Sequence, residues 1–82
     1  MTWGEWMASA ERRLAEVGVS SARLEAQVLA ARSLGRDRSY ALAHRTDAFD
    51  SGTADAWLGR RLAGEPLAYV LGDREFYGRR FA

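Results

Sequence analysis

Helix stop signals constrain the fold of this chain of 82 residues more than any other feature. Gly18, Gly35 and Gly64 each follow a periodic apolar stretch. Glycine commonly ends helices at such positions because it adopts the left-handed conformation at little cost. We therefore predict an all-α fold, a small bundle of four to five helices with a short β-hairpin beginning at the C-terminus.

The first helix is predicted over residues 3–17. Thr2 and Glu5 have the spacing of a capping box, in which each side chain binds a free backbone N–H of the first turn. The apolar residues that follow fall within about 100° of arc on a helical wheel. They are Trp3, Trp6, Met7, Ala10, Leu14 and Val17. We expect the two tryptophans to pack in the core rather than form a base-stacking platform.

The second helix is predicted from Ser20 or Ser21 to about Leu34, and it is apolar on two sides. One face carries Leu24, Val28 and Ala31, and the other carries Ala22, Ala26, Leu29 and Ala30. Glu25 and Arg32 form only a narrow polar strip. A helix of this kind is normally the central member of a bundle.

The remaining helices are shorter. Asp37 is placed to cap a helix that ends near Ala43, and residues 44–52 form a loop that Phe49 anchors. A fourth helix begins near Asp50 or Ser51 and ends at Gly64. Pro66 then favours a last short helix over residues 67–71.

The pattern changes after Gly72. Residues 75–77 are typical of a strand, residues 78–79 of a turn, and residues 80–81 of the start of a second strand. Two strands alone are barely stable in water, so we expect more chain to follow Ala82. The predicted organisation is a helical substrate-recognition domain over residues 1–72. Residues 73–82 begin a hairpin that links it to a catalytic domain absent from this sequence.

Composition limits the functional classes. The chain has no cysteine, no apolar run long enough to cross a membrane and no secretory signal, so we expect a cytoplasmic location and no membrane partner. Its twelve basic residues, all arginine, are nearly balanced by acidic residues along each third of the chain. Nucleic-acid binding needs a concentrated basic surface, and we expect no direct nucleic-acid partner.

No catalytic constellation is evident. One histidine and no cysteine leave neither a zinc site nor a Cys–His pair, and no glycine-rich phosphate loop occurs. We therefore predict no catalytic, cofactor-binding or metal-binding residue. His44 is interpreted as an exposed loop residue. The carboxylates at positions 11, 16, 25, 37 and 55 are interpreted as solvated surface.

Arg61 does not fit a simple surface role. Its helical angle places it between Trp57 and Leu58, inside the apolar stripe of the fourth helix. A buried charge is costly unless it is paired. We therefore expect Arg61 to bind a carboxylate, with Glu65 one turn further as the candidate, or to lie at an interface.

The segment around Arg61 also carries a family resemblance. Residues 60–72 read R-R-L-A-G-E-P-L-A-Y-V-L-G, and residues 74–78 read R-E-F-Y-G. This run resembles the protein-(glutamine-N5) methyltransferases that modify peptide chain release factors. Their N-terminal domains carry a similar R-R-x-x-G-E-P-x-A-Y-x-x-G-x-R-E-F-x-G run. Residues 21–35 also resemble the second helix of those domains.

The resemblance implies a role in a larger enzyme. Members of that family join a small helical domain, through a β-hairpin, to a Rossmann-like domain that binds S-adenosylmethionine and methylates the glutamine of the G-G-Q motif. The implied partners are a peptide chain release factor and the chain's own catalytic domain. This fragment would be inactive alone and would bind no cofactor. Interdomain or partner contacts are expected at Arg61, Glu65, Arg74, Glu75, Phe76, Tyr77 and Arg80, and the arginines at 36, 38 and 45 are candidates for the release factor.

Two other hypotheses about the function remain open. A free-standing helical interaction module would have its native end near Ala82 and would pair the ribbon within the chain or in a dimer. A small nucleic-acid binder would show binding that falls steeply with ionic strength.

Overall fold

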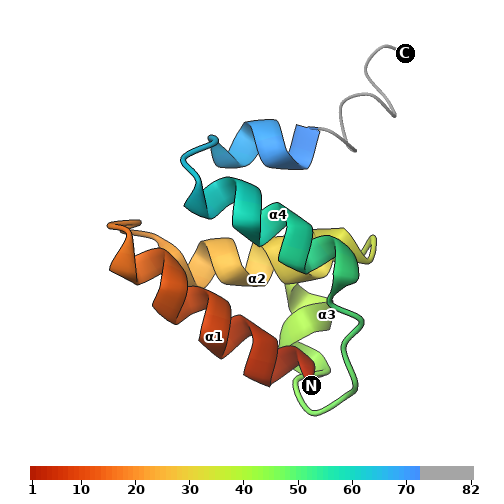
Figure 1. Cartoon of the computed structure of the whole chain (residues 1–82). Coiled ribbons are helices and arrows are strands. Elements are labelled where there is room, and N and C mark those ends of the chain that lie inside the picture. The colour runs from red at the N-terminus through yellow and green to blue at the C-terminus, as the bar shows by residue number, and fades with distance from the viewer. Residues whose placement is uncertain (73–82) are drawn as a thin grey trace, which may run out of the picture.

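The computed structural model describes residues 1–72 (Figure 1). It contains helices α1 (Trp3–Glu16), α2 (Ala22–Ser33), α3 (Arg38–Ala43) and α4 (Gly52–Leu62), and residues 67–72 are also helical. The predicted all-α fold is therefore confirmed, with helix bounds within about two residues of those expected. The predicted hairpin falls on residues 73–82 and lies outside the described residues. No helix in the described part is long and apolar enough to cross a membrane.

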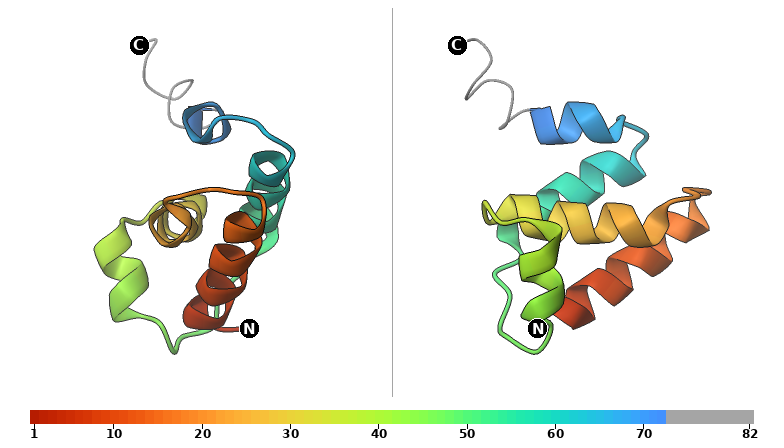
Figure 2. Two further views of the ribbon diagram at one scale, coloured as in Figure 1. Left: turned by 90° about the vertical axis from the view of Figure 1, so that its left-hand side faces the viewer. Right: turned by 180° about the vertical axis from the view of Figure 1, so that it is seen from behind.

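Helix α2 is the central element. It contacts α1, α3 and α4, and Figure 2 shows α3 and α4 on opposite sides of it. Leu29, Ala30 and Ala31 are fully buried. Alanine lets neighbouring helices approach closely, which is why one short helix can hold three partners. The predicted central position is confirmed, although Leu24 on one of its two apolar faces is 44% exposed.

The aromatic core lies between α1 and the loop before α4. Trp3 and Trp6 are buried, as predicted. The ring of Phe49 lies 4.6 Å from that of Trp3 and 5.4 Å from that of Trp6, measured between centroids. These tilted arrangements are the ones that aromatic rings favour. Phe49 therefore anchors the loop, as the sequence indicated.

The same loop also satisfies the first turn of α1. The predicted capping box is present, with Thr2 and Glu5 exchanging side-chain to backbone hydrogen bonds. The N–H groups of Trp3 and Gly4 instead donate to the carbonyl oxygens of Asp47 and Arg45, at 3.1 and 2.9 Å. A helix start leaves these N–H groups without helical partners, so the loop completes the cap.

Helix α4 and residues 67–72 form the other end of the bundle (Figure 1). Trp57 and Leu58 of α4 are buried, and the indole N–H of Trp6 donates to Asp55 Oδ1 at 2.7 Å. Gly64 ends the turn after α4 with φ +107°. The chain then reverses, and Val70 reaches the core with no exposed surface.

Candidate functional site

Arg61 forms an ion pair between two helices. Its Nε lies 2.8 Å from Glu25 Oε1 and its Nη2 lies 3.3 Å from Glu25 Oε2, so the guanidinium of α4 grips the carboxylate of α2 with two hydrogen bonds. The side chains are only 20% and 12% exposed. The hydrogen bond to Glu25 raises the pKa of Arg61 above its ordinary value, against the opposing effect of burial.

The partner differs from the one predicted. Glu65 offers Arg61 only its backbone carbonyl, 3.2 Å from Nη1, while its carboxylate binds Arg60 at 2.7 Å. The interpretation of Glu25 as solvated surface is also wrong. Glu25 precedes Arg61 by 36 residues, and only the packing of α2 against α4 brings the two together.

The Arg61 cluster, as we call these paired residues, therefore joins three segments. Its members are Glu25, Arg60, Arg61 and Glu65. It links α2 and α4 to the turn before residues 67–72, the last helical segment described. Of the expected contact residues, Arg61 and Glu65 lie together here. Arg74, Glu75, Phe76, Tyr77 and Arg80 lie outside the described residues.

A second group of polar residues surrounds α3. The Arg36 guanidinium carbon lies 4.4 Å from the centroid of the Tyr40 ring, and the His44 ring stacks on Tyr40 at 3.8 Å. His44 Nδ1 also lies 2.8 Å from the Tyr40 carbonyl oxygen. His44 is thus half-buried at the end of α3, which corrects its interpretation as an exposed loop residue. Stacking on Tyr40 is the physical reason.

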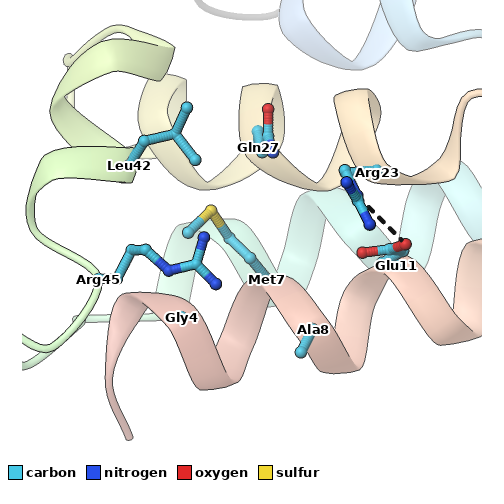
Figure 3. Close-up of a pocket in the computed structure, with 8 residues that line it drawn as sticks. All are labelled: Gly4, Met7, Ala8, Glu11, Arg23, Gln27, Leu42 and Arg45. Carbon is cyan, nitrogen blue, oxygen red and sulfur yellow. Dashed lines mark ion pairs between the residues drawn. The ribbon is translucent and has the colours of Figure 1, made fainter.

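A groove runs between α1, α2 and the end of α3 (Figure 3). Its volume is about 340 Å³. Figure 3 shows its lining residues, which are Gly4, Met7, Ala8, Glu11, Arg23, Gln27, Leu42 and Arg45. Arg45, a candidate contact from the sequence, lies at one end, and an ion pair between Arg23 and Glu11 lies at the other. Arg38 lies beside the groove, where its Nε donates to Gln27 Oε1 at 3.1 Å.

Sequence reasoning did not find this groove. One signal for it was present in Gly4, because a glycine in the first turn of a helix often marks a close approach. A Cβ at Gly4 would lie 3.2 Å from the Arg45 carbonyl oxygen, tighter than ordinary contact. The loop can therefore lie against α1 only where that helix has no side chain.

The described residues contain no group of three His, Cys, Asp or Glu side chains that could hold a metal ion. What the described part offers is binding chemistry: arginines around α3, a groove with a polar rim, and an ion-paired cluster beside the last described helix.

The chain matches a known protein family. The PrmC N-terminal domain matches residues 5–72, which is most of the chain. This chain belongs to the PrmC N-terminal domain family. The match over residues 5–72 includes the Arg61 cluster and every residue that lines the groove except Gly4.

Individual relatives of the PrmC N-terminal domain agree with the resemblance in the sequence. A release factor glutamine methyltransferase of Bordetella pertussis is 52% identical over 63 residues, covering 73% of this chain and 23% of that protein. The Haemophilus influenzae protein of the same name is 36% identical over 81 residues, covering 94% and 28%. A bifunctional methyltransferase of Rickettsia felis is 33% identical over 78 residues, covering 92% and 15%. No solved structure matches the chain.

The matched relatives are all much longer than this chain. The chain spans between 15% and 28% of the length of these relatives. It is similar to the N-terminal domain of release factor glutamine methyltransferases.

Proposed function

We propose that this chain is the release-factor-binding domain of an S-adenosylmethionine-dependent methyltransferase that methylates the glutamine of the G-G-Q motif in peptide chain release factors. The observation that carries the proposal is the family match over residues 5–72. In this role the domain holds the protein substrate, and a separate domain carries the cofactor and the chemistry.

The chemistry of the reaction favours such a division of labour. A single glutamine side chain offers an enzyme little to discriminate, so contacts remote from the reacting group must supply specificity and orientation. The domain offers exposed arginines at positions 36, 38 and 45 around α3. Arginine is enriched at protein interfaces because it combines several hydrogen-bond donors with an apolar stem.

The Arg61 cluster has a different part in this proposal. It lies just before residues 67–72 in the chain, and its ion pairs tie α4 to the turn at Glu65 on one side and to α2 on the other. We assign it the role of orienting residues 67–72, and thereby the catalytic domain, relative to the bound release factor. The interdomain contacts expected at Arg74, Glu75, Phe76, Tyr77 and Arg80 follow this segment in the sequence.

Titration calorimetry of the 82-residue chain with a purified release factor tests the proposal. We expect saturable binding with a Kd on the order of micromolar, as is common for a small protein interface. An unrelated acidic protein of similar size serves as the control for general charge attraction. Absence of binding to the release factor, or equal binding to the control protein, would contradict the proposed function.

A further inference from the structure

The groove between α1, α2 and α3 has an uneven distribution of polar groups. Arg45 at one end makes no ion pair with any residue in 1–72. Arg23 at the other end is already paired with Glu11, at 3.6 Å. At one end of the groove the Glu11 carboxylate is thus paired with Arg23. At the other end Arg45 has no ion-pair partner among residues 1–72.

Gln27 adds a second donor to the rim. Its Oε1 accepts a hydrogen bond from Arg38 Nε, so the amide NH₂ is the part that remains for an occupant. The polar groups left for binding, the Arg45 guanidinium and the Gln27 amide, are therefore both donors. Their natural ligand is an oxygen acceptor, above all a carboxylate.

The floor of the groove is apolar. Met7 lies below with 6% of its surface exposed, and Leu42 of α3 flanks it with 39% exposed. Figure 3 shows the Arg45 side chain extending along α1 toward the Met7 sulfur. An occupant that meets only the arginine would leave the exposed part of Leu42 in water, so an acidic group attached to an apolar one fits better.

The Arg45 backbone is held in place before any partner arrives. Its carbonyl oxygen accepts a hydrogen bond from the Gly4 N–H at 2.9 Å. Two residues further along the chain, the backbone carbonyl oxygen of Asp47 accepts one from the Trp3 N–H at 3.1 Å. A binding group on a fixed backbone loses less conformational entropy on association.

From these features we propose that the groove binds an acidic segment of the release factor, with a carboxylate against Arg45 and Gln27 and a neighbouring apolar side chain over Met7 and Leu42. This inference rests on the proposed function, because it names the part of that partner which docks. A protein segment is favoured over a nucleic acid. The exposed apolar surface of Leu42 in the groove gives a continuous phosphate backbone nothing to bind, whereas a protein segment can place an apolar side chain against it.

Three variants of the chain test the inference in the same calorimetric titration. Arg45→Glu places a carboxylate where the partner's carboxylate should bind, and we expect it to weaken binding about tenfold or more. Ala8→Trp fills the groove without changing charge, and a similar loss is expected. Arg13→Glu is the matched control, because it makes the same charge change on the far side of α1 and should alter the Kd by less than about twofold.

The result separates the two proposals. If the unaltered chain binds the release factor and both groove variants bind it equally well, the groove assignment is overturned and the proposed function stands. If the unaltered chain does not bind, the proposed function fails, and the assigned occupant fails with it. Binding of a single-stranded oligonucleotide that Arg45→Glu abolishes would overturn the assignment to a protein segment. Circular dichroism of each variant, matching that of the parent, establishes that the fold is retained.

Discussion

At the scale of single residues, two Arg–Glu pairs differ mainly in how much water reaches them. Arg61 and Glu25 are 2.8 Å apart with side chains 20% and 12% exposed, whereas Arg23 and Glu11 are 3.6 Å apart and 77% and 40% exposed. Water screens the second pair, and long exposed side chains lose entropy when they are held together. The first pair is partly desolvated, so removing one partner leaves the other charge poorly compensated.

We therefore expect Arg61→Ala to lower the free energy of unfolding by about 2–3 kcal/mol, and Arg23→Ala by less than about 0.5 kcal/mol. Urea titrations followed by circular dichroism measure both. Equal losses in the two variants would show that burial does not distinguish the pairs. Because the hydrogen bond to Glu25 raises the pKa of Arg61 in the folded chain, the stabilising charge is fully present at neutral pH and is lost only as the pH rises through that raised pKa.

At the scale of elements, Gly59 in α4 and Gly64 in the turn after it have opposite conformational requirements. Gly59 lies inside α4, and a Cβ there would meet nothing within 4 Å. Gly64 lies in the turn with φ +107°, where a side chain is strained even though space is available. Helical glycine is costly through its backbone entropy, whereas a left-handed turn is the conformation for which glycine is suited.

Alanine should consequently have opposite effects at these two positions. We expect Gly59→Ala to raise the free energy of unfolding by about 0.5–1 kcal/mol and Gly64→Ala to lower it by about 1–2 kcal/mol. In a domain of this size these changes correspond to shifts of several degrees in Tm, measured by thermal melts. Stabilisation by both substitutions would mean that the turn after α4 does not require positive φ.

At the scale of the whole molecule, the open question is whether residues 67–72 unfold together with α1–α4. Val70 is fully buried in the same cluster as Leu14, Leu29 and Trp57, which come from three helices. Tyr69 beside it is 69% exposed. A small domain has a thin core, so even a peripheral helix that adds one buried valine contributes measurably to stability.

We expect Val70→Ala to lower the global free energy of unfolding by about 2 kcal/mol, from lost burial and the cavity it leaves. Tyr69→Ala, the neighbouring control, should change it by less than about 0.5 kcal/mol. Chemical denaturation gives both values. If Val70→Ala left the main transition unchanged, residues 67–72 would form a separate unit that opens independently.

Local signals in the sequence were sufficient for most of the elements. The capping box of Thr2 and Glu5, the glycine stops and the Asp37 cap depend on residues within a few positions of one another. Helix periodicity likewise identified the buried tryptophans and the central helix. The R-R-x-x-G-E-P run identified the family, which the match over residues 5–72 shows.

The site required the tertiary structure. Glu25 and Arg61 are 36 residues apart in the sequence. Helical periodicity assigned Glu25 to a solvated strip, because it shows only which side of its own helix a residue lies on. Leu24 is 44% exposed although it shares a predicted apolar face with the fully buried Ala31, because periodicity does not show how much of a face another element covers. The approach of Arg45 to Gly4 likewise depends on a loop folding back onto α1. The sequence by itself thus determined which segments are helical, because capping and periodicity act over one or two turns. The pairing of charges and the shape of the groove were decided only by packing between segments distant along the chain.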